Sequence, residues 1–284
     1  MFRRTAAAAA GTLLLLAAAS WLPPHGSAAQ PATRPLGDLA RPALPVPDVL
    51  PAAAPGPLPA VSGFFWALSA AVTGQGVAGA AAPAPRSEAA GRSASEQGGP
   101  QPAAPGTEAF ARAYSYLAQS WQNTLPFSAF VQGWAQTRAL DLLAAIPAGP
   151  PAGDPSAERV FVEVRTLAEI GGETPHAVLG YAAGFYTAEP GPRGWHLRGG
   201  GLTPETFPLH RAGRSAGPDP VAAAAAGNLA RQAGRPGAGS VPSVRVTAGP
   251  DHRASAAVRL GNETYTVLLY ELVDGQWVAL RVSR

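Results

Sequence analysis

The sequence predicts an α+β protein in which N-terminal helices pack on a curved antiparallel sheet and a smaller helix-plus-four-strand meander follows. Three observations lead to this fold class. Aromatic residues recur at helical spacing over residues 108–123, apolar and polar residues alternate over 160–165, and the two-residue turn signals Gly261-Asn262 and Asp274-Gly275 separate strand-like runs near the C-terminus. Helices that precede strands, rather than alternating with them, favour an antiparallel sheet.

The aromatic residues predict two helices before the first strand. Phe110, Tyr114 and Trp121 fall on one face of a single helix over 108–123. Pro126 ends this helix, and Ser128 is expected to cap a second, short helix. Both helices therefore present aromatic side chains toward the predicted sheet.

The first sheet is expected to contain four strands. Val160, Val162 and Val164 alternate with more polar neighbours, which indicates one buried face. A turn at Gly171-Gly172 and a Pro-Gly loop over 190–194 separate the later strands. The expected strands are 138–146, 160–165, 176–187 and a last one that begins at Trp195.

A second, smaller unit follows residue 218. Asp219 is expected to cap a helix that ends near residue 233. Both positions of the Asp274-Gly275 turn are expected to adopt positive φ. The expected strands are 241–248, 253–260, 263–272 and 276–282. Residues 262–277 also echo 172–195 in the order Glu-Thr, Tyr, Gly, Trp, which is explained either by an abbreviated internal repeat or by chance similarity between hairpins.

Residues 1–29 have the features of an export signal. Arg3 and Arg4 precede an apolar run over 6–22, and small residues at 27–29 fit cleavage after Ala29. The same run could instead remain as an uncleaved membrane anchor, because about 17 apolar residues approach the length that spans a bilayer. Either way, we expect the protein to be extracytoplasmic, either secreted or part of the cell envelope.

Residues 30–106 are rich in Pro, Ala and Gly and predict a disordered linker or stalk. An apolar stretch over 61–82 interrupts it and is interpreted as a loosely ordered or surface-associated helix, with a second membrane segment as the alternative. The expected organisation is a signal peptide or anchor over 1–29, this linker over 30–106, an α+β domain over 107–205, a linker over 206–218 and a small α+β domain over 219–284.

Composition excludes several function classes. The chain has no cysteine, so it has neither disulfides nor a thiolate site. All 21 basic residues are arginine, which suggests a GC-rich bacterial gene. Removal of Arg3 and Arg4 with the signal leaves 19 arginines against 18 acidic residues, so we expect no nucleic-acid partner. Five scattered histidines predict no metal site, and no motif calls for a cofactor.

The helical and strand motifs resemble the nuclear transport factor 2-like superfamily, also described as cystatin-like cones. The segments that carry the resemblance are Tyr114-x-Tyr116-Leu117, the run from Phe127 to Thr137, Arg159 to Val164, Gly180-Tyr181 and Gly194 to Arg198, within residues 107–205. The likeness is to exported bacterial members of obscure function. It implies a bent sheet whose concave face receives N-terminal helices, but no particular activity.

The resemblance also implies one enzymatic alternative. Isomerases and dehydratases of this superfamily place an acid–base pair inside the cone. The candidates here are Asp141, His176 and Tyr181, and further polar side chains in the same domain are His196, Tyr114 and Tyr116. None matches a catalytic motif of those enzymes, and each has a structural explanation as a strand-surface or core residue.

The leading hypothesis is a noncatalytic binding or scaffold module of the cell envelope. Its partner would be a protein, a peptide or an apolar small molecule. Candidate contact residues are large aromatics, each of which could equally serve the core: Trp121, Trp134, Tyr181 and Trp195. The alternatives are the isomerase-like or dehydratase-like enzyme and a membrane-tethered component of a secretion or conjugation assembly, which requires an uncleaved N-terminal segment.

Overall fold

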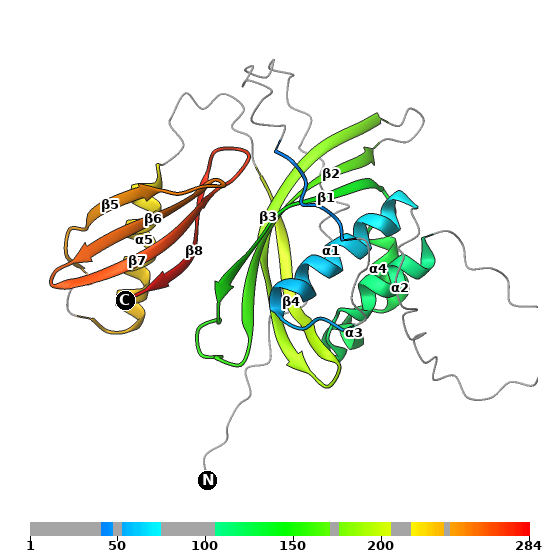
Figure 1. Cartoon of the computed structure of the whole chain (residues 1–284), viewed down its shortest axis with the longest axis horizontal. Coiled ribbons are helices and arrows are strands. Elements are labelled where there is room, and N and C mark those ends of the chain that lie inside the picture. The colour runs from blue at the N-terminus through cyan, green and yellow to red at the C-terminus, as the bar shows by residue number, and fades with distance from the viewer. Residues whose placement is uncertain (1–40, 48–52, 75–105, 171–175, 206–216, 236–238) are drawn as a thin grey trace, which may run out of the picture.

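The α+β fold class is confirmed by a computed structural model that describes residues 41–47, 53–74, 106–170, 176–205, 217–235 and 239–284 (Figure 1). The first module contains four helices and a four-stranded sheet. Its helices are α1 (Pro57–Thr73), α2 (Thr107–Ser115), α3 (Gln119–Thr124) and α4 (Phe127–Gln132). Its strands are β1 (Thr137–Gly149), β2 (Glu158–Ile170), β3 (His176–Gly191) and β4 (Gly194–Pro204).

The second module also has helical structure followed by a four-stranded sheet, but its described residues form one helix. It contains α5 (Pro218–Gln232), β5 (Ser243–Ala248), β6 (Arg253–Leu260), β7 (Glu263–Glu271) and β8 (Trp277–Ser283). Both sheets are antiparallel meanders in which sequence neighbours are also spatial neighbours, in the orders β1-β2-β3-β4 and β5-β6-β7-β8. The described parts of the echoed segments fall on the third and fourth strands of each sheet, and residues 172–175 of the first segment lie outside the described residues.

Helix α1 occupies the centre of the first module (Figure 1). Val61, Phe64, Phe65 and Leu68 are at most 2% exposed and belong to the same buried cluster as the inward side chains of β1 and β2. Gly63 is required there, because a β-carbon at this position would lie 2.7 Å from the hydroxyl of Tyr116. The core of the module is therefore built around α1.

The apolar stretch within residues 30–106 differs from its prediction. The sequence predicts a loosely ordered or surface-associated helix inside a linker, whereas residues 57–73 form a helix that is buried in the core. Gly74 caps this helix, and residues 75–82 of the stretch lie outside the described part of the chain. Among the residues that the structure describes, no helix combines the length and apolar character needed to cross a membrane. The proposed signal over 1–29 also lies outside them.

The single helix predicted over 108–123 is two helices. The chain leaves the helical path at Tyr116–Ala118, where it pairs with β4: the Leu197 amide donates to the Tyr116 carbonyl at 2.8 Å, and the Ala118 amide donates to the Leu197 carbonyl at 2.7 Å. These sheet-like bonds replace helical ones. Periodicity alone could not reveal the break, because α2 and α3 still direct their aromatic residues to the same core.

The predicted helix caps are wrong in detail. Ser128 lies inside α4, whose N-cap is Pro126, and Asp219 lies in the first turn of α5, whose N-cap is Gly217. In each case proline near the helix start sets the backbone dihedral, and no side chain caps the helix. The carboxylate of Asp219 can still interact favourably with the positive end of the helix dipole.

The hairpins of the second module follow the predicted strand boundaries closely, but the turn at Asp274-Gly275 differs from its prediction. Gly261 and Gly275 adopt positive φ, whereas Asn262 and Asp274 do not. Two consecutive positive φ values occur instead at Asp251 and His252, 55° and 60°, between β5 and β6. The amide of Arg253 donates to the Pro250 carbonyl at 3.1 Å, which closes this type I′ turn.

A glycine in the β3–β4 hairpin gives a sharp test of the strand pairing. A β-carbon at Gly184 would lie 1.9 Å from the carbonyl oxygen of Gly201 on the neighbouring strand, whereas one at Gly199 would meet nothing within 4 Å. We expect Gly184→Ala to destabilise the protein by at least about 3 kcal/mol, because the two backbones must separate. Urea unfolding of this variant beside Gly199→Ala checks it, and equal stability of the two would contradict the register.

Candidate functional site at the junction of the two modules

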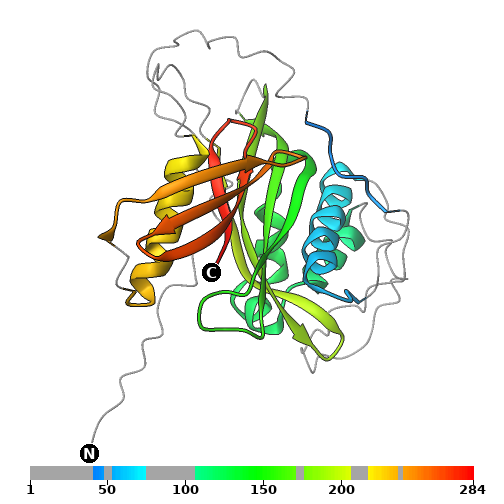
Figure 2. The same cartoon turned by 60° about the vertical axis from the view of Figure 1, so that its left-hand side comes forward.

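The two modules meet through the outer face of the first sheet. Along β2, Val160, Val162 and Val164 face the helices, so Phe161 and Glu163 face the opposite way. Phe161 packs against Tyr270 of β7 with ring centroids 5.3 Å apart. Figure 2 shows the hairpin of β7 and β8 lying against the strands of the first sheet. We call this contact the junction; its buried apolar residues are Ala144, Ile146, Phe161, Ala183, Tyr270, Leu272 and Leu280.

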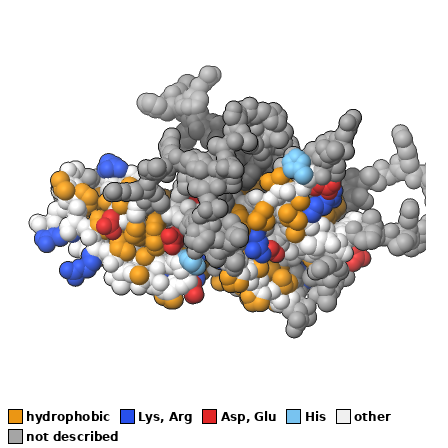
Figure 3. Space-filling view, turned by 90° about the horizontal axis from the view of Figure 1, so that it is seen from above, with side chains coloured by type: hydrophobic (Ala, Val, Ile, Leu, Met, Phe, Trp, Pro, Cys, Tyr) orange, Lys and Arg blue, Asp and Glu red, His pale blue; other side chains and the backbone are white. Residues whose placement is uncertain are grey.

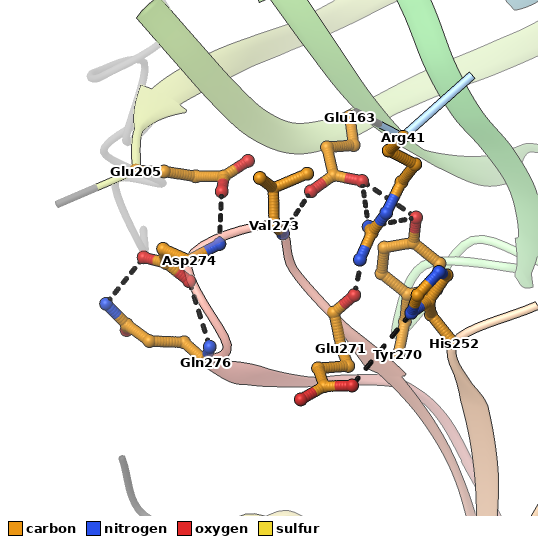
Figure 4. A network of polar contacts seen from close by, with 9 residues as sticks. All are labelled: Arg41, Glu163, Glu205, His252, Tyr270, Glu271, Val273, Asp274 and Gln276. Atoms are coloured by element: carbon orange, nitrogen blue, oxygen red, sulfur yellow. Dashed lines mark hydrogen bonds and ion pairs between the residues drawn. The ribbon is translucent and has the colours of Figure 1, made fainter. Parts of the chain in front are cut away.

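A fully buried carboxylate lies within the junction. Glu163 is 0% exposed, and its two oxygens accept three hydrogen bonds (Figure 4). Arg41 Nη1 and the Tyr270 hydroxyl donate to Oε2 at 2.6 and 2.7 Å, and the amide of Val273 donates to Oε1 at 2.8 Å. Two distant parts of the chain, residue 41 and residues 270–273, therefore converge on the Glu163 side chain.

Arg41, which precedes α1 in the sequence, lies in the junction and binds Glu163. Its Nη1 also donates to the Tyr270 hydroxyl at 2.8 Å and to the Glu271 carbonyl at 3.1 Å. The guanidinium lies over the Tyr270 ring, 5.4 Å from its centroid. Residues 41–47 are held beside β1, where the Leu44 amide donates to the Leu142 carbonyl at 2.7 Å. Arg41 thus supplies the positive charge that a buried Glu163 requires.

A second carboxyl group lies beside Glu163. Glu205 follows β4, and its Oε2 accepts from the Asp274 amide at 3.2 Å. Burial, followed by the charge of Glu163 and a hydrogen bond with it, raises the pKa of Glu205 to about 8. At neutral pH the Glu205 carboxyl therefore carries a proton in the folded protein. Asp274 is engaged separately, because its oxygens accept from the amide and the side-chain amide of Gln276, both at 2.9 Å.

The raised pKa of Glu205 predicts how stability depends on pH. A carboxyl whose pKa is higher in the folded than in the unfolded state favours folding at low pH, and this advantage is lost as the pH rises from about 4.5 to about 8. We expect Glu205→Gln, which mimics the protonated group, to be more stable than the native protein at pH 8 by about 1–2 kcal/mol. Urea unfolding at pH 5 and pH 8 measures this, and an equal pH dependence of both proteins would refute the assignment.

The candidate acid–base residues do not come together on the inner face of the first sheet. Asp141 lies on the outer face of β1, where its Oδ2 accepts from Arg165 Nη2 and Nε at 2.6 and 2.9 Å. Tyr181 is also aligned with Arg165, from the opposite side of β2, and is buried against Val273. His176 is exposed at the first residue of β3. Asp141, Arg165 and Tyr181 therefore lie side by side on three neighbouring strands, on the face of the sheet opposite the helices.

The other polar candidates serve as structural residues. The Tyr114 hydroxyl donates to the Leu125 carbonyl at 2.7 Å, and burial raises its pKa. Burial also raises the pKa of Tyr116, which packs against α1 at Gly63. His196 lies on β4, with a half-buried side chain beside Gly191. Each hydroxyl or ring is thus part of the packing around α1 or of the β3–β4 hairpin.

The candidate binding tryptophans contribute to the core of the first module. Trp134 is 8% exposed, and Trp121 and Trp195 are partly buried against the same cluster. The ring of Trp121 lies 6.3 Å from that of Tyr186. Tyr181, the fourth candidate, belongs to the small cluster beside the junction with Leu143 and Val273. Three of the four candidates therefore pack in or against the first core, and Tyr181 packs beside the junction.

Sequence reasoning missed the residues that form the junction network. Arg41 lies within the segment interpreted as linker, and Glu163 lies on the face of β2 that the alternation marks as polar. Alternation correctly predicts that Glu163 points away from the first core, but it cannot show that another module covers it. Tyr270 belongs to the echoed motif, which predicts an internal repeat or a chance similarity and not a contact between the modules.

No protein-family model and no curated protein sequence matches the chain. Among solved structures, the chain is similar to an Ntf2-like protein involved in plasmid conjugation, with 10% sequence identity and a TM-score of 0.22. The alignment covers 62% of this chain and 86% of the other. A TM-score this low establishes neither a shared fold nor a shared function.

Proposed function

We propose that the protein is an extracytoplasmic, noncatalytic scaffold whose two modules are held in a fixed arrangement to bind a protein partner. One observation carries this proposal: the chain itself covers both faces of the first sheet. The aromatic side chains of α1 fill the inner face, with Phe64 and Phe65 at most 2% exposed. The second module covers the part of the outer face that forms the junction, around Phe161 and Glu163.

A sheet covered in this way favours a macromolecular partner over a small molecule. The inner face, where an isomerase of the resembled superfamily would hold its substrate, is occupied by Phe64, Phe65 and Tyr186, whose rings contact one another. Asp141, the best candidate base, faces the other way and is paired with Arg165. Among the described residues, the terminal strands of the two sheets present edges to which a partner could bind.

The intact mass of the native protein tests the location that this function requires. Membrane and soluble extracytoplasmic fractions of the producing cells would be analysed separately. A soluble species that begins at Gln30 supports a released scaffold. A protein found only in the cytoplasm would contradict the proposal.

A membrane-tethered component of a secretion or conjugation assembly is the second candidate. It is favoured by the shared plan of the two modules, each with helical structure followed by a four-stranded meander, because tandem modules behind an anchor suit such assemblies. This version predicts a full-length species, with residues 1–29 retained, in the membrane fraction. Cleavage after Ala29 would exclude it in favour of the released scaffold.

A further inference from the structure

Charge is fully segregated between the two faces of the second sheet. The strands β5–β8 carry four arginines, and the pairing register and the exposure pattern place all four on the face opposite α5: Arg245, Arg253, Arg259 and Arg281. The two strand carboxylates lie on the other face. Glu263 pairs with Leu260, and Glu271 pairs with Trp277, both of which pack in the α5 cluster.

The positively charged face is open to solvent beside β5 and β6. Arg245, Arg253 and Arg259 are exposed, and Ser243, Thr247 and Ser255 surround them with hydroxyl groups. In the pairing register, Ser243 lies opposite Arg259. Arg245 pairs with Ala257 and is therefore a diagonal neighbour of Arg259. Basic side chains project from this end of the molecule (Figure 3). Neither carboxylate of β5–β8 lies on this face, whereas the chain as a whole has 21 arginines against 18 acidic residues.

Strand β5 also has a free edge. It is the terminal strand of its sheet, paired only with β6 among the described strands. The Gly249 amide donates to the Arg253 carbonyl at 2.8 Å. Bonded pairs alternate in an antiparallel ladder, so residues 243, 245 and 247 bond to β6. Val244, Val246 and Ala248 therefore direct their amide and carbonyl groups toward the open edge.

The side chains on the two faces of β5 determine which peptide sequence could pair with its free edge. On the α5 side, Val244 and Val246 are only half-buried against the second core. On the opposite side, the neighbours are Arg245 and the hydroxyls of Ser243 and Thr247. Cross-strand neighbours stand about 5 Å apart, so alternate side chains of an added strand would contact one face each. An added strand fits best when acidic side chains alternate with apolar ones.

We propose that the edge of β5 binds an extended acidic peptide segment of a partner protein by strand addition. Main-chain hydrogen bonds to Val244, Val246 and Ala248 would supply affinity, and carboxylates beside Arg245 and Arg259 would supply specificity. Arg259 already donates to the Gly261 carbonyl at 3.1 Å and retains further donors on its guanidinium. This inference rests on the proposed scaffold function and names the chemistry of its partner.

A synthetic peptide tests the proposal on the folded full-length protein. The probe is an acetylated, amidated and fluorescently labelled peptide of about eight residues in which Glu and Val alternate. We expect saturable one-to-one binding by fluorescence anisotropy and slower hydrogen exchange at the amides of Val244, Val246 and Ala248. The alternating Lys-Val peptide is expected not to bind. Absence of Glu-Val binding, or equal binding of both peptides, would overturn the proposal.

Two variants separate charge from strand addition. Arg245→Glu should weaken binding by about tenfold or more, because it places like charges side by side. Arg193→Glu makes the same charge change on the exposed β3–β4 turn of the first module and should leave binding unchanged. Ala248→Pro removes an outward amide that β6 does not use, so the strand is expected to persist while binding falls about tenfold. Ala248→Ser retains the amide and should bind normally.

The remaining outcomes are equally decisive. If Arg245→Glu weakens binding but Ala248→Pro does not, the peptide is held by charge alone and strand addition is refuted. If a dodecamer of thymidylate displaces the peptide at equal concentration, the face is a general polyanion surface and the acidic-peptide assignment is refuted. Circular dichroism of each variant confirms that it is folded. None of these results alters the intact-mass test, so failure here leaves the scaffold function open.

Discussion

Replacement of Glu163 by alanine is expected to destabilise the folded protein by about 3–5 kcal/mol. The change removes the acceptor for Arg41, Tyr270 and the Val273 amide at once. It leaves the Arg41 guanidinium, only 9% exposed, without its counter-charge. An unpaired buried charge and unsatisfied donors are among the costliest defects in a protein interior. Urea unfolding at pH 7, followed by circular dichroism, measures the loss.

A second glutamate on the same strand provides the matched control. Glu169 pairs with Arg138, but the two side chains are 36% and 56% exposed. We expect Glu169→Ala to cost less than about 1 kcal/mol, because an exposed ion pair contributes little. Similar losses for the two variants would show that the junction does not bury Glu163. Hydrogen exchange at the Val273 amide adds a local readout, since only Glu163→Ala should deprotect it.

The double replacement of Arg41 and Glu163 distinguishes a lost charge from a lost contact. Arg41→Met combined with Glu163→Leu removes both charges and restores apolar volume. If the cost of Glu163→Ala comes mainly from the unpaired Arg41, the double variant should be clearly more stable than Glu163→Ala. If the double variant is as unstable as the single one, the hydrogen bonds to Tyr270 and Val273 dominate instead.

Local patterns in the sequence predict the strands well because each strand has one face against a core. Val160, Val162 and Val164 mark the inner face of β2, and the hairpin of β6 and β7 turns at Gly261 as expected. The same patterns contain no information about which module lies on the polar face. The burial of Glu163 arises from a contact more than 100 residues away in sequence.

Helix α1 shows why the average composition of a segment can predict a linker where the chain forms a buried helix. Pro, Ala and Gly on both sides of residues 57–73 lower the average apolar content, so the segment reads as part of a linker. The helix itself is apolar on almost every side, with buried residues from Ala60 to Ala71, and such helices belong in a core or a membrane. The prediction from sequence, a surface-associated helix or a membrane segment, does not include a place in the core, because the strands that α1 packs against lie far along the chain.

Replacement of Phe65 by alanine is expected to destabilise the first module by about 3–5 kcal/mol. Phe65 is 0% exposed, and its ring packs edge-on against Phe64 and Tyr186 at 5.1 and 5.2 Å between centroids. Removal of the ring deletes these contacts and leaves a cavity that neighbouring backbone cannot fill. Urea unfolding followed by tryptophan fluorescence measures the change, since Trp121 and Trp134 belong to the same core.

The same helix supplies the control. Thr73 is exposed in its last turn, where its hydroxyl donates only to carbonyls of α1 itself. Thr73→Ala should therefore change stability by less than about 0.5 kcal/mol. If the segment were instead a linker or a surface helix, Phe65→Ala would be as mild as Thr73→Ala, and a chain that begins at Thr107 would fold with full stability. We expect that shortened chain not to fold, because without α1 the inner face of the sheet would lose the side chains that cover it.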